Sequence, residues 1–313
     1  MNGLSRVVAL AVVVVTAFVL AVGAYAVSFT GWAPAQKIDD IPGNSPDLNT
    51  ASLDGCPIQS PDGRSLYMAS NRPGGLGGLD IWVAYRSKDT NRWGAPINLG
   101  EPVNSASDDF CPTPVRGGLY FVSREALPGA CGQGDIYFAS QKDKSWSEPV
   151  RLLCSTAGGP NSELDEQGPS YVRSDGREML FFSRGSGAPF PVVPGEIFVS
   201  EKLGDLFGPA VAVSELNDAT ANDIQPNVRK DGREVVFSSN RAGGAGAQDV
   251  WVSTRRSIAD PWSAPVNLGS AVNTTASESR PSLSWHAEQL LFGRSPGPEG
   301  SNDIYVTTRE REK

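Results

Sequence analysis

Short apolar segments bounded by turn residues recur along the chain. Examples are SLYMAS from Ser65, EMLFFS from Glu178 and EVVFSS from Glu234, in which apolar residues alternate with polar ones or run together. Segments of this length between clusters of Gly, Pro, Asn and Asp are typical of β-strands. The pattern therefore predicts an all-β fold.

The segments belong to a repeat of roughly 55 residues, a period typical of repeat architectures. It is clearest in a glycine-rich stretch, SNRPGGLGGLDIWV from Ser70, which returns as SNRAGGAGAQDVWV from Ser239. Weaker copies begin at Ser123, Ser183 and Gly293, which makes five. Each copy follows an acid-x-x-Pro motif and a turn, and all but the last precede an aromatic residue shortly before a proline. Four strands fit in each unit, as in a propeller blade.

The two ends of the repeat region complete each other. The fifth unit ends as DIYVTTREREK and lacks a fourth strand, whereas a spare strand of this type, GWAPAQKI, begins at Gly31. An N-terminal strand that completes the last blade would leave no sheet edge unpaired. We therefore predict a single domain, residues 27–313, that forms a five-bladed β-propeller of four-stranded antiparallel blades.

The first 26 residues have the features of a signal peptide. Arg6 precedes a long apolar run from Val7 to Val22, and Ala24-Tyr25-Ala26 matches a cleavage site. The alternative is an uncleaved membrane anchor, since an apolar segment of about 20 residues can cross a bilayer. Both place the remaining chain outside the cytoplasm, in the periplasm or secreted, and membrane contact is expected only through an uncleaved N-terminal segment.

Charge and cysteine content narrow the class of protein. The net charge is −8, and it becomes −9 when the segment containing Arg6 is removed. No Lys or Arg cluster stands out, which argues against a nucleic-acid partner. In an oxidising compartment the four cysteines predict two disulfides. Our first pairing is Cys56 with Cys111 and Cys131 with Cys154, although the sequence permits three connectivities.

The combined motifs resemble a known repeat. Together they are similar to the TolB-type, WD-like β-propeller repeat of bacterial exported proteins. The motifs are D-x-x-P, S-P-D-G, S-N-R-x-G-G, D-I-W/Y-V and W-x-x-P-x-N-L-G. The resemblance covers nearly everything from Trp32 to Glu310. It implies the fold and the export, but propellers of this type serve many functions.

One acidic residue lies three positions before a proline in every unit. Such carboxylates could bond to neighbouring backbone, bind Ca²⁺ as the one expected cofactor, or supply the acid and the base or nucleophile of a glycosidase. A residue repeated in every blade more often serves the blade than a single reaction centre. The five candidates are Asp54, Asp109, Glu166, Asp223 and Glu278.

Each glycine-rich loop also begins near an arginine and ends at an acid. We expect these two residues to form an ion pair that fixes the ends of the loop, worth about 0.2–1 kcal/mol if exposed. The arginines are Arg72, Arg124, Arg184, Arg241 and Arg294, and the acids are Asp80, Asp135, Glu196, Asp249 and Asp303.

Departures from the repeat indicate where function lies. The third glycine-rich loop carries Phe190, Val192 and Val193 between prolines, which suggests a contact surface. The single histidine, His286, excludes most His-dependent catalysis. The main expectation is an exported binding or scaffold module, rather than an enzyme, that contacts an envelope protein, glycan or cell-wall ligand through the face of the glycine-rich loops. The alternative is a carbohydrate-active hydrolase that uses two of the five repeated carboxylates.

Overall fold

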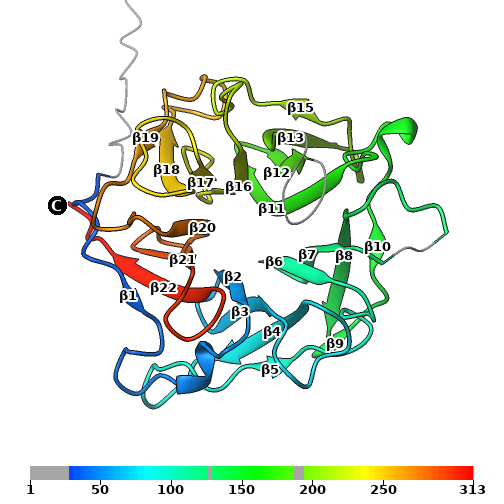
Figure 1. Cartoon of the computed structure of the whole chain (residues 1–313). Coiled ribbons are helices and arrows are strands. Elements are labelled where there is room, and N and C mark those ends of the chain that lie inside the picture. Colours follow the sequence, from blue (N-terminus) through cyan, green and yellow to red (C-terminus); the bar gives the residue numbers. More distant parts are fainter. Residues whose placement is uncertain (1–27, 126–127, 186–193, 313) are drawn as a thin grey trace, which may run out of the picture.

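The computed structural model describes residues 28–125, 128–185 and 194–312. The described residues form five antiparallel sheets arranged in a ring around a central axis, which confirms the predicted five-bladed β-propeller (Figure 1). The predicted signal peptide lies outside the described residues. No described helix is long and apolar enough to span a membrane.

Each sheet runs from an inner strand at the axis to a short outer strand. Blade one contains β2 (Asp54–Gln59), β3 (Ser65–Ser70), β4 (Asp80–Tyr85) and β5 (Ile97–Asn98). Blade two contains β6 (Asp109–Val115), β7 (Gly118–Ser123), β8 (Asp135–Lys142), β9 (Ser145–Trp146) and β10 (Val150–Arg151). Blade three contains β11 (Asp165–Ser174), β12 (Arg177–Gly185), β13 (Glu196–Leu203), β14 (Leu206–Phe207) and β15 (Val211–Ala212).

The last two blades follow the same plan. Blade four contains β16 (Asp223–Val228), β17 (Glu234–Ser239), β18 (Asp249–Thr254) and β19 (Val266–Asn267). Blade five contains β20 (Ser277–Leu283), β21 (Gln289–Ser295), β22 (Asp303–Thr308) and, from the start of the chain, β1 (Gln36–Lys37). Two single-turn 3-10 helices, Pro46–Leu48 and Ser155–Ala157, lie in connections.

The N-terminal strand closes the ring as predicted. Strand β1 pairs antiparallel with β22, with Gln36 opposite Val306 and Lys37 opposite Tyr305. Further along the same edge, the Ala33 N–H donates to the Thr308 carbonyl at 2.9 Å. Without β1, strand β22 would expose unpaired backbone N–H and C=O groups that can pair with another chain. The pairing with β1 therefore removes an edge that promotes aggregation.

Apolar side chains fill the spaces between neighbouring blades. One cluster joins Phe181 of blade three to Phe237 and Trp251 of blade four, and another joins Leu291 of blade five to Met68 of blade one. Since a fully buried large apolar side chain contributes roughly 1.5–3 kcal/mol, these contacts between blades hold the ring together.

The glycine-rich loops pack directly on the next blade. A β-carbon at Gly77 would collide with the carbonyl oxygen of Ser107, which lies in the segment that leads into blade two. Gly246 lies in the same way against Ala276, ahead of blade five. Glycine is therefore required because another backbone passes too close for any side chain.

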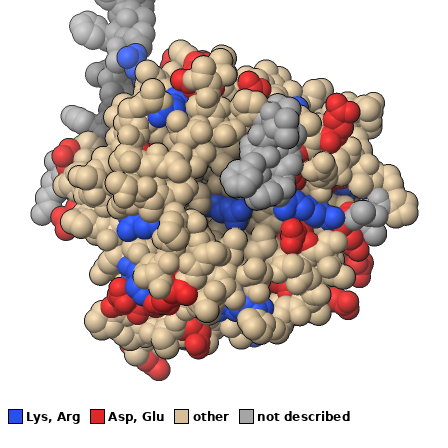
Figure 2. Space-filling model, viewed as in Figure 1, with Lys and Arg blue, Asp and Glu red and all other residues tan. Residues whose placement is uncertain are grey.

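Every inner strand contains a bulge immediately before its proline. Proline has no N–H for the sheet ladder, and the register of each inner strand shifts at this point. The residue before each proline has a left-handed backbone and lines a narrow channel with a cavity of about 30 Å³. These residues are Cys56, Cys111, Gly168, Gln225 and Arg280. A hollow with Lys or Arg atoms at its floor lies at the centre of the disc (Figure 2).

Candidate functional site

The five repeated acids lie inside the blades instead of in an open ring at the channel mouth. Each is at most 1% exposed, and each follows the loop that enters the inner strand of its blade. A carboxyl group enclosed to this degree does not reach a glycosidic oxygen in the channel. The residues concerned are Asp54, Asp109, Glu166, Asp223 and Glu278.

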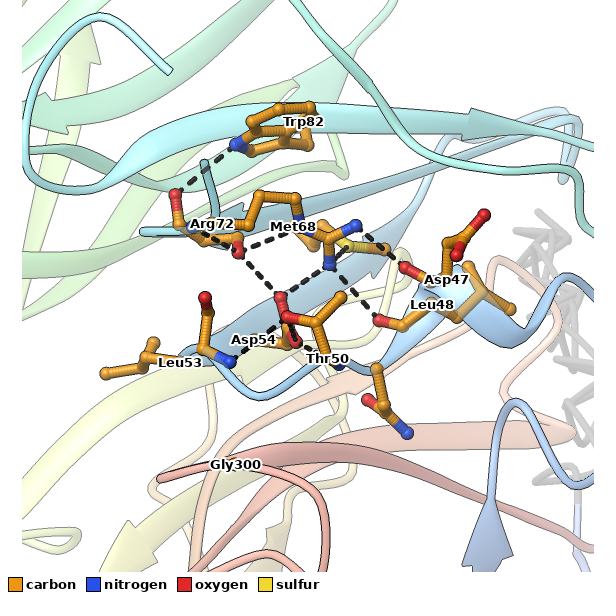
Figure 3. Close-up of polar contacts among 12 residues, drawn as sticks. Asp47, Leu48, Thr50, Leu53, Asp54, Met68, Arg72, Trp82 and Gly300 are labelled. Carbon is orange, nitrogen blue, oxygen red and sulfur yellow. Dashed lines mark hydrogen bonds and ion pairs between the residues drawn. The ribbon is translucent and has the colours of Figure 1, made fainter. Parts of the chain in front are cut away.

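Asp54 shows how such a carboxylate is satisfied (Figure 3). It accepts hydrogen bonds from the N–H of Thr50 at 2.6 Å, the Thr50 hydroxyl at 2.8 Å and the Ser70 hydroxyl at 2.6 Å. Arg72 forms an ion pair with the same carboxylate and donates to the carbonyl oxygen of Asp47 at 2.7 Å. The cluster thus ties the entering loop to the end of β3.

Three other blades repeat this arrangement. Arg184 lies 2.8 Å from Glu166, Arg294 lies 2.7 Å from Glu278, and Arg241 pairs with Asp223. A hydroxyl or N–H from the preceding loop bonds to each of these acids as well. The geometry favours the structural interpretation of the repeated carboxylates over catalysis.

The predicted ion pairs across the glycine-rich loops are wrong. Asp80 instead accepts from the backbone N–H of Leu76 at 2.5 Å and of Gly77 at 3.1 Å, and from the Asn98 amide at 2.7 Å. The short aspartate side chain folds back onto its own loop, whereas the long arginine reaches the buried acid of the inner strand.

Two of the other acids at the ends of the glycine-rich loops have the same contacts as Asp80, and two differ. Asp249 and Asp303 bond to loop N–H groups in the same way as Asp80. Asp135 bonds to the Cys131 N–H at 2.8 Å and lies 3.8 Å from Arg151. Glu196 is exposed.

Blade two breaks the arginine pattern. Arg124 lies 3.1 Å from Asp108 and 2.7 Å from Asp165, so it bridges blades two and three. Asp109 keeps its bond from the Ser105 hydroxyl at 2.7 Å but has no cation, and its Oδ1 has no hydrogen-bond partner among the described residues. Burial raises the pKa of Asp109 to about 6, although the hydrogen bonds from Ser105 act in the opposite direction.

The structure contains the two disulfides that we gave as our first pairing. Cys56–Cys111 joins the inner strands of blades one and two beside the channel, and Cys131–Cys154 closes a loop within blade two. Disulfides of this kind are typical of oxidising compartments outside the cytoplasm.

Arg280 extends into the channel from blade five. Its Nη1 donates to Cys56 Sγ at 3.2 Å, and its guanidinium lies 5.9 Å from the centre of the Phe110 ring. No carboxylate of the described residues lies within 4.0 Å of it. Burial, and then repulsion from Arg124, lower the pKa of Arg280 to about 10, so it stays charged at neutral pH.

A second polar side chain, Gln225, lines the same cavity and connects to further polar groups. The Gln167 amide donates to Asp165 at 2.7 Å, and the Gln225 amide donates to Gln167 at 3.4 Å. The Oε1 of Gln225 is buried and has no partner among the described residues. Gln225 and Arg280 line the channel cavity, and a chain of hydrogen bonds and ion pairs links Gln225 to Gln167, Asp165, Arg124 and Asp108. These six residues are here called the channel cluster.

The channel cluster was not predicted from the sequence, although one signal for it was present. The acid and the proline of the motif repeat in every blade, but the two residues between them vary, as Gly-Cys, Phe-Cys, Gln-Gly, Ile-Gln and Ser-Arg. That variation marks the position at which the five blades differ at the axis.

Three other expectations have different outcomes. In the described part of the chain no group of three or more His, Cys, Asp or Glu residues is placed to hold a metal ion. Phe190, Val192 and Val193 lie outside the described residues. His286 lies at the opposite end of the blades, where it lines a groove of about 600 Å³ with Trp285 and Arg64.

Comparisons with known proteins agree on the fold. No family model and no curated protein matches the chain. An α-L-arabinofuranosidase from Podospora anserina in complex with cellotriose is similar, with a TM-score of 0.57, 12% identity, and coverage of 90% of this chain and 96% of that chain. A thermostable family-43 glycoside hydrolase has a TM-score of 0.55 and 14% identity, with coverage of 86% and 92%.

A putative TolB from Agrobacterium tumefaciens is more distant, with a TM-score of 0.47 and 11% identity over 91% of this chain and 99% of that chain. Because no family model matches the chain, the TolB-type resemblance remains a prediction. At these identities the similarity shows that this chain has the five-bladed propeller fold, shared with several glycoside hydrolases.

Proposed function

We propose that this protein is an exported glycan-binding propeller that holds its ligand over the channel cluster. The observation that carries the proposal is the cluster itself: Gln225 and Arg280 occupy a position at which the blades depart from their repeat and line the channel, and amide and charged groups continue from Gln225. Amide and charged side chains of this kind bind sugar hydroxyls and acidic groups through hydrogen bonds.

The structural similarities favour a glycan over a protein as the ligand. Several similar folds are enzymes named for arabinose- or xylose-containing glycans, among them the arabinofuranosidase and a xylan β-1,4-xylosidase. The two disulfides support a location in the periplasm or outside the cell, and a cleaved signal peptide would deliver the protein there.

The geometry supports binding better than hydrolysis. A glycosidase needs two accessible carboxyl groups, one of which protonates the leaving oxygen. The repeated acids are enclosed, and in the channel cluster Asp108 and Asp165 both bond to Arg124. Asp109 has the raised pKa of a general acid, but it is only 1% exposed.

Binding and cleavage can be measured on the same samples. The purified protein is titrated calorimetrically with arabino-, xylo-, cello- and galacturono-oligosaccharides, and the release of reducing ends is followed separately. We expect at least one oligosaccharide to bind without release of reducing ends. Release of reducing ends that depends on Asp109 would support the hydrolase instead, and a lack of binding to all four series would refute the proposal.

Two variants locate the site. Gln225→Gly removes an amide of the channel cluster, and the backbone tolerates it because Gly168 has the same left-handed conformation in blade three. Gln59→Ala removes an amide at the other end of an inner strand, where it donates to Gln289. Gln225→Gly should weaken binding several-fold and Gln59→Ala should not; the reverse would place the ligand elsewhere.

A further inference from the structure

Within the described part of the chain, Arg280 forms no ion pair in the channel. The one carboxylate among the described residues whose charge acts on Arg280 is that of Asp165, and it is paired with Arg124. The only side-chain partner of the Arg280 guanidinium among the described residues is the sulfur of Cys56, a weak acceptor. The cation is therefore only partly solvated and has donors available for a ligand.

The surroundings of Arg280 indicate an anion instead of a neutral ligand. The ordinary pKa of arginine is lowered here because the charge is removed from water and faces a second cation, Arg124. Burying a charge without a partner is costly, so an anion that binds beside it recovers part of that cost. A guanidinium presents N–H groups in a planar fork that matches the two oxygens of a carboxylate.

The channel limits the size of the anion. Its cavity of about 30 Å³ is lined by the residues around the five prolines and has room for about two water-sized groups. A carboxylate group fits that space, whereas a sugar ring must remain outside in the hollow. The buried, unpartnered Oε1 of Gln225 lines the same cavity and can accept a hydrogen bond from a hydroxyl group.

We propose that the glycan is acidic, and that Arg280 binds the carboxylate of a uronic acid residue inserted into the channel. This inference rests on the proposed function, because it specifies the glycan held over the channel cluster. Gln225 contacts a hydroxyl of the same sugar, and the neighbouring sugars lie in the hollow.

The experiment compares oligogalacturonate with neutral xylo-oligosaccharide of the same length, by calorimetric titration at pH 7 and fixed salt. A charge-assisted bidentate contact predicts at least about tenfold tighter binding of the acidic ligand. In Arg280→Gln the preference for the acidic ligand should disappear, because the acidic ligand loses far more affinity than the neutral one. Blade four has Gln225 at the equivalent left-handed position, so the substitution fits the backbone.

Two readouts separate a ligand contact from a structural role. If Arg280 only supported the fold, its replacement would lower the melting temperature, whereas removal of a half-buried cation without an anion should leave the melting temperature unchanged or raise it. Arg280→Lys keeps the charge but loses the planar fork, so it should recover only part of the preference.

The outcomes distinguish the two proposals. Equal affinity for acidic and neutral ligands, or an equal loss of both in Arg280→Gln, refutes the carboxylate contact and leaves glycan binding standing. If the protein binds neither ligand and none of the other oligosaccharides, glycan binding itself is refuted. Acetate, or a peptide with a free C-terminal carboxylate, could also bind as tightly as the acidic oligosaccharide. That result would assign the channel to another source of carboxylate and overturn the inference.

Discussion

Replacing Asp109 with asparagine should stabilise the protein at neutral and alkaline pH. The carboxyl is 1% exposed and lacks the arginine that accompanies the other four repeated acids, because Arg124 is bonded to Asp108 and Asp165. Burial raises its pKa from the ordinary value of 3.8 to about 6. Asparagine has nearly the same shape and carries no charge, so it removes the cost of ionisation.

The magnitude follows from the pKa. At about 1.36 kcal/mol per pKa unit, the rise corresponds to about 3 kcal/mol of lost stability when Asp109 is ionised. Because the pKa of Asp109 is higher in the folded protein than in the unfolded chain, its contribution to stability is most favourable at pH values below the unfolded pKa of 3.8. That contribution is lost as the pH rises through the folded pKa of about 6. The advantage of Asp109→Asn should therefore be full near pH 8 and absent near pH 4.

The assay is thermal and urea unfolding of both proteins at pH 4 and pH 8. For a chain of this size, about 3 kcal/mol is an increase of several degrees in melting temperature. The matched control is Asp223→Asn, which leaves Arg241 buried without its carboxylate and should cost about 3–5 kcal/mol. If Asp109→Asn destabilises the protein at pH 8 as much as the control does, the reasoning about an unpaired carboxyl is refuted.

Three further predictions concern the ring and its stabilisation. Deleting residues 28–41 removes β1 and exposes the edge of β22, so the protein should aggregate or melt at lower temperature; a soluble product with unchanged melting would contradict ring closure. Loss of the Cys56–Cys111 disulfide, which closes a loop of 55 residues, should cost about 4 kcal/mol, and loss of Cys131–Cys154, which closes 23 residues, about 3 kcal/mol. Urea unfolding of the two double Cys→Ser variants measures these costs, and no destabilisation of either variant would contradict the prediction. Calcium and EDTA should give the same melting temperature, since the described residues contain no cluster of metal ligands, and a higher value with calcium would restore the calcium hypothesis.

Much of the architecture was predictable because it is repeated in the sequence. Local rules acting on each unit give a strand, a turn, a glycine-rich connection and a further strand, and the spare strand at Gly31 indicated how the ring closes. The pairing of Cys56 with Cys111 was also within reach, since equivalent positions of adjacent blades face each other at the axis.

The charged partners were not predictable, because they depend on distances between blades. Arg72 and Asp80 are close in sequence, yet the arginine reaches Asp54, whose buried charge lacks any alternative cation. Arg124 departs from this pattern because packing brings Asp165 of the next blade within 2.7 Å of it.

The sequence by itself determined the blades, their number and the way the ring closes, since these follow from local patterns that occur in every unit. Only the tertiary structure decided which charges are paired. Arg280 is a residue before a proline in the sequence, and it becomes a cation without a carboxylate only when five inner strands converge on one narrow channel. Function is proposed there because the axis is the place where residues from all five blades meet.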